Sequence, residues 1–210
     1  REFAQNELAP KSIEIDNIEV IKVYNGELPS FESENVWIVT GSRYSVYDDI
    51  DWVLSFRDTI KKGLDLKVPM LGICFGHQII CDALGSTVTN NNMGWEIGSS
   101  EVSLTKKGKE SHLFNKFKPA FSVYQSHQDI VRDVPDGVDV LAQNEYGVQS
   151  ISFNDTVFGV QFHPEFSFDV MKAYYSIRIK KINNKEKHFV SKQNDGVKVI
   201  DNFINTISRR

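Results

Sequence analysis

The sequence is poor in cysteine, and it has no long hydrophobic run. Its 210 residues include only two cysteines, too few for a disulfide framework, so we expect a reducing compartment such as the cytoplasm. No apolar stretch approaches the roughly 18 residues of a membrane-spanning helix, so we expect no membrane partner. Positive charge is not in excess either. The chain has 24 basic and 28 acidic residues, a net charge of −4, which argues against a nucleic-acid partner.

What is present is enough for one folded domain over residues 1–210. Hydrophobic residues make up 40% of the chain and charged residues 25%, a composition typical of globular proteins. Apolar runs alternate with segments of helical period, which predicts an α/β fold with a mostly parallel sheet flanked by helices. A small additional β-rich portion is expected over about 87–152, where short alternating stretches are separated by glycine, asparagine and proline.

Four apolar runs are predicted to be strands: residues 18–24, 36–40, 68–73 and 157–162. The 36–40 run is nearly all apolar, so we place it at the centre of the sheet, buried on both faces. Helical spacing predicts helices over 48–63 and 78–84, and a helical tail over about 168–210 that is interrupted by a polar loop at 183–194.

The strongest chemical motif is the GICFGHQ segment at residues 72–78, which lies between a predicted strand and a predicted helix. It has the form of a nucleophile elbow, in which a sharp turn presents the central residue, here Cys74. The flanking Gly72 and Gly76 are needed because a Cβ at either position would collide with a neighbouring strand or helix. A free cysteine is more often a buried small hydrophobe, but the two glycines and the strand-to-helix context favour a nucleophile.

A thiol nucleophile needs a base, and the segment His163-Pro164-Glu165 supplies one. It follows a predicted strand, as Cys74 does, so both lie at the carboxyl end of the sheet, where open α/β sheets place their sites. Residues at i and i+2 of an extended chain project to the same side, so Glu165 can orient the His163 ring. An isolated His-x-Glu is usually a surface pair, and this one gains meaning from the elbow.

Gly41 also follows a predicted strand, in the segment TGSR at residues 40–43. A glycine lets backbone N–H groups approach a ligand, so Gly41 and the N–H of Phe75 are candidates for an oxyanion hole. Without the elbow, an ordinary glycine between strand and loop would be the better interpretation.

These motifs, together with SHQD at residues 126–129 and GWE at 94–96, closely resemble the class I (triad) glutamine amidotransferases. The resemblance is strongest to the stand-alone GMP synthase-like subgroup and covers the chain to about residue 166. It implies a flavodoxin-like α/β fold and a catalytic triad of Cys74, His163 and Glu165. It also implies that Gln78, Ser126 and His127 line a glutamine pocket, partly through main-chain groups, and that no cofactor or metal is needed.

The activity that the resemblance implies is hydrolysis of the γ-amide of glutamine or of a γ-glutamyl compound through a cysteine thioester. The substrate would be a small molecule. A separate synthetase subunit is a possible partner, since the chain has no phosphate-binding loop of the G-x-x-x-x-G-K-[ST] type. Two alternatives within this interpretation are a γ-glutamyl peptidase and a non-catalytic regulatory module on the same fold.

Two further expectations concern single segments. A metal site at His77, Cys81 and Cys74 is a weak alternative, because three such ligands on one helix edge rarely converge.

Relatives begin with a strand inside the sheet and then a helix, whereas residues 1–8 already have the pattern of that helix. We therefore expect that the sequence starts inside the domain and lacks roughly 20 to 40 residues, enough for one strand and its loop.

Overall fold

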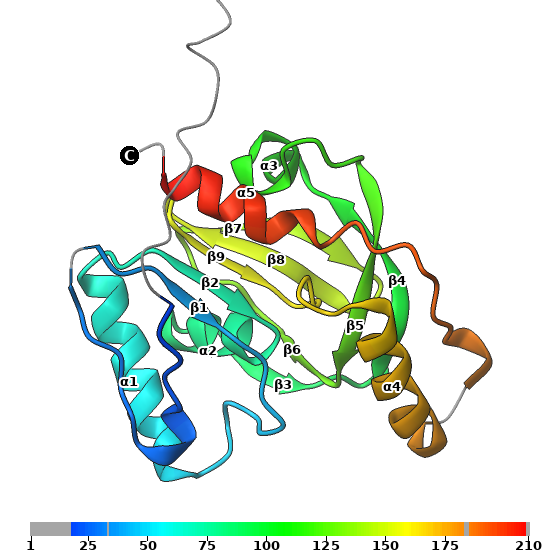
Figure 1. Ribbon diagram of the computed structural model, residues 1–210, viewed down its shortest axis with the longest axis horizontal. Helices are drawn as coiled ribbons and strands as arrows, with labels where there is room; N and C mark the ends of the chain where they lie inside the picture. Colours follow the sequence, from blue (N-terminus) through cyan, green and yellow to red (C-terminus); the bar gives the residue numbers. More distant parts are fainter. Residues whose placement is uncertain (1–17, 33, 183–184, 209–210) are drawn as a thin grey trace, which may run out of the picture.

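The computed structural model describes residues 18–32, 34–182 and 185–208. Seven strands form one sheet in the order β1-β2-β9-β8-β7-β4-β5, with helices on its two faces (Figure 1), so the predicted α/β class is confirmed. These strands are β1 (Trp37–Val39), β2 (Met70–Ile73), β4 (Glu96–Leu104), β5 (Ala120–His127), β7 (Val138–Asn144), β8 (Gly147–Phe153) and β9 (Val157–Val160).

The sheet is mixed, with its parallel part at one end. β1 runs parallel to β2, and β2 runs parallel to β9, whereas β8, β7, β4 and β5 continue the sheet in antiparallel pairs. The β-rich segment predicted over 87–152 thus supplies four strands of the main sheet. It also forms a small antiparallel sheet of β3 (Val88–Asn90) and β6 (Asp129–Val131). The parallel portion is therefore smaller than the sequence pattern led us to expect.

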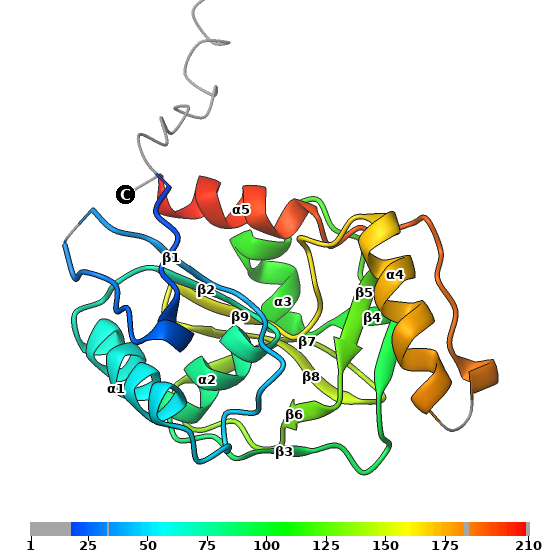
Figure 2. The same ribbon diagram turned by 60° about the horizontal axis from the view of Figure 1, so that its bottom comes forward.

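The strands of the parallel part are covered by helices on each side of the sheet. α1 (Asp51–Asp65) and α2 (Phe75–Ala83) pack on the face that carries Met70 and Val157. α5 (Lys198–Ile207) packs on the opposite face, against Leu71 and Phe158. Figure 2 shows the sheet between these two layers. Alternate side chains of one strand thus enter two different cores, which explains the continuous apolar runs.

The other helices of the described residues are shorter or lie toward the β-rich end of the sheet. They are α3 (Lys106–Glu110), α4 (Phe168–Arg178) and four short 3₁₀ segments: Val23–Asn25, His112–Phe114, Ile179–Lys181 and Lys185–Lys187. α4 packs on a third apolar cluster that contains Ile97, Tyr124 and Met171. The helical tail predicted over about 168–210 thus contains two helices, α4 and α5, on different parts of the sheet (Figure 1).

Two strand predictions need correction. Residues 18–22 have no regular structure and lead into a 3₁₀ turn, and they pair with none of the strands in the described part of the chain. The side chains of Ile18 and Val20 are exposed. The strand at 36–40 exists as β1, but it lies at the end of the described sheet rather than its centre, with Ile38 45% exposed. A short apolar run predicts a strand without showing how many neighbours that strand has.

The helix predicted over residues 1–8 lies outside the described residues, so the expectation of a missing first strand stays a prediction. Of the helices in the described ranges, none combines the length and the hydropathy that crossing a membrane requires.

Candidate active site

Three predicted site segments follow three adjacent parallel strands. Gly41 comes after β1, Cys74 directly after β2, and His163 after β9, and these strands are neighbours in the order β1-β2-β9. Since all three strands run in the same direction, their carboxyl ends lie at one edge of the sheet. The topology therefore brings together residues that are far apart in the sequence.

Cys74 has a strained backbone. Its φ of 53° and ψ of −104° place a non-glycine residue in a positive-φ conformation, which costs of order 1–3 kcal/mol. The turn is held by a hydrogen bond of 2.9 Å from the Cys74 N–H to the carbonyl oxygen of Val160 in β9. Cys74 is also the N-cap residue of α2, and its side chain makes no capping bond. The thiol thus sits beside the N-terminus of α2, the end of a helix that carries a partial positive charge.

The glycines on either side of Cys74 have the steric role that the sequence predicted. A Cβ at Gly72 would lie 2.4 Å from the carbonyl oxygen of Gly76, inside the first turn of α2. A Cβ at Gly76 would lie 2.0 Å from the carbonyl oxygen of Val39 in β1. Both obstacles are backbone atoms, so neither can be relieved by a change of side-chain rotamer. The close approach of α2 to two strands depends on these glycines.

His163 and Glu165 form a pair. The Nδ1 atom of His163 lies 2.7 Å from Oε1 of Glu165, and the imidazole is buried whereas the carboxylate is about one-third exposed. A carboxylate only accepts hydrogen bonds, so Nδ1 donates and Nε2 is left for another partner. A Cβ at Gly41 would lie 3.2 Å from Cε1 of His163 and 3.7 Å from Cβ of Cys74. Gly41 therefore lies against both residues.

The environment of His163 favours its charged form. Burial lowers its pKa, but the negative charge of Cys74, a hydrogen bond to that residue, and the Glu165 carboxylate together raise the pKa to about 10. Nε2 is buried, and its interaction with Cys74 has a looser geometry than an ordinary hydrogen bond. Loose geometry of this kind is common in sites without substrate. The environment thus keeps the His163 imidazole protonated beside the Cys74 side chain.

Substituting Glu165 with glutamine should shift the alkaline limb of the pH–rate profile to lower pH. In the native protein His163 stays protonated up to about pH 10, and removing the Glu165 charge lowers the pKa of His163, so its acidic form is lost earlier as the pH rises. We also expect kcat at neutral pH to fall at least about 100-fold, because the ring loses its orienting partner.

The measurement is kcat for hydrolysis of a γ-glutamyl substrate as a function of pH, for wild type, Glu165→Gln and Asp169→Asn. Asp169 is an exposed acid in the first turn of α4 and serves as the control for loss of one negative charge. An alkaline limb at the same pH in wild type and Glu165→Gln would contradict the role assigned to Glu165.

Phe166 is a neighbour of His163 that sequence reasoning missed. Its ring stacks on the imidazole with centroids 4.1 Å apart and planes at 16°. Phe166 in turn contacts Tyr174 of α4, at 5.0 Å between centroids. The His163 ring is therefore held in its plane by Glu165 and on one face by Phe166. No pattern in the sequence marks this contact, apart from the position of Phe166 just after the motif.

The residues predicted to line a glutamine pocket have side chains that are largely engaged within the protein. Nε2 of Gln78, in α2, donates to the carbonyl oxygen of Asp129 and to Oε1 of Gln161, each at 3.0 Å. His127, at the end of β5, is buried between two acceptors. Ser126 is buried as well, and its Oγ has no hydrogen-bond partner among the described residues. A pocket role for these three residues stays a prediction.

The acceptors of His127 belong to a buried polar network that the sequence did not reveal. Nε2 of His127 lies 3.0 Å from Oε2 of Glu96, and Nδ1 lies 3.0 Å from the carbonyl oxygen of Asp129. Both ring nitrogens are thus engaged, which fixes the orientation of the imidazole between β4 and β6. Glu96, 1% exposed, also accepts from Asn144 and Gln149. The available signal was the GWE motif at residues 94–96, which contains Glu96.

His77 has a structural environment. It is fully buried, and burial together with the charge of His127 lowers its pKa to about 3, so the ring is neutral. It packs on β9, where a Cβ at Gly159 would lie 2.4 Å from its Nδ1 atom. Its contact with Cys81 is 3.8 Å, and within the described ranges no three acidic, cysteine or histidine residues are grouped as metal ligands.

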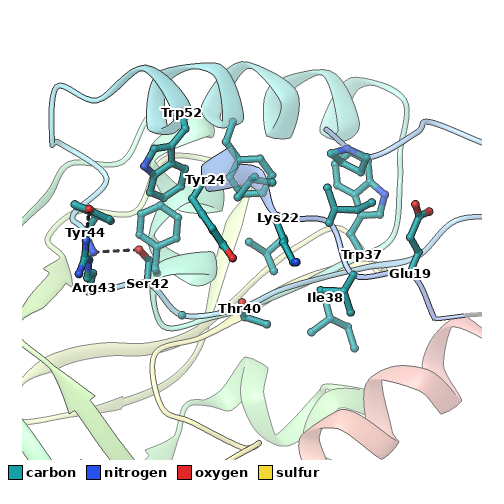
Figure 3. Close-up of a pocket in the computed structure, with 18 of the residues that line it drawn as sticks. Glu19, Lys22, Tyr24, Trp37, Ile38, Thr40, Ser42, Arg43, Tyr44 and Trp52 are labelled. Carbon is teal, nitrogen blue, oxygen red and sulfur yellow. Dashed lines mark hydrogen bonds between the residues drawn. The ribbon is translucent and has the colours of Figure 1, made fainter. Parts of the chain in front are cut away.

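A groove of about 800 Å³ runs beside β1 and is lined by that strand, by residues 19–24 and by α1 (Figure 3). One end is formed by the segment that follows β1, including Ser42, Arg43 and Tyr44, and the other end reaches Trp37. Gly41 and Phe75 border the groove, but Cys74 and His163 do not. The groove therefore adjoins the predicted oxyanion residues without containing the predicted nucleophile or the predicted base.

The chain is similar to known proteins of one family. Residues 38–181 match the family model described as glutamine amidotransferase class-I. The chain is 32% identical over 156 residues to γ-glutamyl peptidase 4 of Arabidopsis thaliana, covering 71% of this chain and 62% of that protein. It is 38% identical over 141 residues to a subunit of the glutamine-hydrolysing GMP synthase of Sulfolobus acidocaldarius, covering 66% of this chain and 70% of that protein.

A solved structure has the same fold. The glutamine amidotransferase of Thermotoga maritima superposes with a TM-score of 0.72, at 24% identity, over 90% of this chain and 84% of that one. The chain spans only about three-fifths of the length of γ-glutamyl peptidase 4, at 62%. With the family model covering most of the chain, the sequence belongs to the class I glutamine amidotransferase family.

Proposed function

We propose that this chain is an amidohydrolase that cleaves the γ-amide of glutamine or of a γ-glutamyl compound, with Cys74 as nucleophile and His163 and Glu165 completing a triad. The observation that carries the proposal is the position of Cys74, held in a strained turn at a helix N-terminus beside a buried imidazole whose other nitrogen is bonded to Glu165. Nucleophile, base and orienting group are the minimum set for covalent acyl transfer.

In the first half of the reaction, the Cys74 thiolate attacks the γ-carbonyl carbon and a tetrahedral oxyanion forms. The N–H groups next to Gly41 and Phe75 are the proposed donors to that oxyanion, and one such donor is typically worth about 3 kcal/mol of barrier. The C–N bond then breaks while His163 gives its proton to the departing amine. A γ-glutamyl thioester on Cys74 and a neutral His163 remain.

In the second half, neutral His163 takes a proton from water as the water oxygen attacks the thioester carbon. The resulting tetrahedral intermediate collapses, glutamate leaves, and the Cys74 thiolate and the His163 imidazolium are restored. Glu165 keeps Nδ1 protonated throughout, so Nε2 alone exchanges the proton. Because Cys74 must remain a free thiol for this cycle, we propose a reducing location such as the cytoplasm.

Two substrate classes have specific support. The similarity to γ-glutamyl peptidases favours a γ-glutamyl peptide that the chain hydrolyses alone. The similarity to the GMP synthase of Sulfolobus acidocaldarius favours glutamine, with ammonia passed to a separate synthetase partner. A non-catalytic module is the weaker alternative, because such a module has no need for a strained cysteine beside a charged histidine.

The test is release of ammonia from glutamine compared with release of free amino acids from a panel of γ-glutamyl peptides. Activity on peptides but not on glutamine would identify a peptidase. Activity on glutamine would support the amidotransferase alternative. A folded protein whose Cys74 reacts with iodoacetamide but which hydrolyses neither substrate would refute the proposed function as a property of the isolated chain.

A further inference from the structure

The segment that carries Gly41 has no regular structure. It runs from the end of β1 to the start of α1, over residues 40–50, and is a series of turns. On one side it is tied to α1, where Nη2 of Arg57 donates to the carbonyl oxygen of Val46 at 2.6 Å. An oxyanion donor must stay within about 0.5 Å of its place to be effective, so a loop that carries one needs further support.

Asp129 provides that support from a different part of the chain. Its carboxylate accepts a hydrogen bond from the Ser45 hydroxyl and another, 2.8 Å long, from the Tyr47 hydroxyl. Ser45 and Tyr47 lie in the 40–50 segment, whereas Asp129 begins β6, 84 positions after Ser45. Asn90 of β3 adds a longer contact of 3.4 Å to the same carboxylate.

The main chain of Asp129 holds a different part of the site. Its carbonyl oxygen accepts from Nε2 of Gln78 at 3.0 Å and from Nδ1 of His127 at 3.0 Å. Gln78 belongs to the first turn of α2, and its own N–H bonds the carbonyl oxygen of Cys74 at 3.0 Å. The residue that anchors the Gly41 segment is thus also bonded to the helix that begins with Phe75.

From these contacts we propose that Asp129 is a positioning residue for the oxyanion hole. Its carboxylate fixes the segment that carries Gly41, and its carbonyl fixes the helix that carries Phe75, so one residue sets the distance between the two proposed donors. The inference rests on the proposed function. It gives the fourth residue of the SHQD motif a role that the motif alone did not suggest.

The first test compares two reactions of Cys74 in Asp129→Ala. Hydrolysis of a γ-glutamyl substrate passes through an oxyanion, whereas alkylation by iodoacetamide is a direct displacement that does not. We expect kcat to fall about 10- to 100-fold, as for a reacting group misplaced by about 1 Å, and the alkylation rate to stay within about twofold of wild type.

A second variant, Ser45→Ala with Tyr47→Phe, removes the same side-chain hydrogen bonds and leaves Asp129 in place. It should reproduce most of the loss in kcat. If Asp129→Ala does not fold, the kcat of this double variant tests the proposal in its place. The matched control is Asp133→Asn, because the Asp133 carboxylate accepts from the Thr87 N–H, at 2.6 Å, and not from the 40–50 segment. We expect this control to keep wild-type kcat.

Hydrogen exchange gives a readout that does not depend on activity. The amides of residues 41–47 should exchange faster in Asp129→Ala and in the double variant than in wild type. The proposal is overturned by unchanged exchange there, by wild-type kcat in the folded variants, or by alkylation that slows as much as hydrolysis. If wild type is inactive on every γ-glutamyl substrate, the proposed function fails, and exchange alone still tests the anchoring.

Discussion

Replacing Cys74 with alanine should lower kcat for γ-glutamyl hydrolysis by at least about 10⁴-fold, because no other described group can form the thioester. Alanine occupies the same strained backbone position, and the Cys74 side chain is small, so the fold should survive. The thermal midpoint should change by no more than a few degrees, as expected for a change of about 1 kcal/mol in a domain of this size. Activity assays and thermal unfolding of the same preparation check both statements.

Cys81 offers a matched control within the same helix. It is 1% exposed, and burial raises the pKa of its thiol far above the ordinary value, so it is an inert core residue. Cys81→Ala should lose some stability through a small cavity but keep near-normal kcat. Mass spectrometry after iodoacetamide treatment should find the label on Cys74 and not on Cys81. Near-normal turnover in Cys74→Ala would refute the nucleophile assignment.

The parts of this site that the sequence predicted are those encoded locally. A strand, a sharp turn and a helix over residues 70–83 are all visible in the spacing of apolar residues and glycines, and the strained Cys74 follows from that turn. The His163–Glu165 contact is also local, since the two residues are at i and i+2. Each of these inferences needs only the geometry of a short segment.

The parts that the sequence did not predict depend on contacts between distant segments. Glu96 and His127 face each other because β4 and β5 pair in one particular register, which neither strand specifies alone. The hydrogen bonds of Asp129 to the 40–50 segment likewise require the sheet, α1 and β6 to be in place. The position of β1 at the end of the described sheet is a third property of the whole fold, and there the local pattern led to a wrong prediction.

Replacing Gly76 with alanine should destabilise the protein by at least about 3 kcal/mol or prevent folding. In an ordinary helix, alanine is more stable than glycine by roughly 0.5–1 kcal/mol, so the expected sign is reversed here. The cause is the new Cβ, which would lie 2.0 Å from the carbonyl oxygen of Val39 and 2.7 Å from its carbonyl carbon. Relief requires α2 to move away from β1, which displaces the turn at Cys74 as well.

Gly85, just beyond the C-terminal end of α2, is a control position at which a new side chain meets backbone strain but no steric clash. Its φ is +101°, but a Cβ there would meet no atom within 4 Å. Gly85→Ala should therefore cost only the strain of a positive φ, about 1 kcal/mol, and keep its activity. Urea unfolding of the two variants gives the comparison. If Gly76→Ala proves as stable as wild type, the close packing of α2 on β1 is not what fixes the Cys74 turn, and the steric account of the elbow fails.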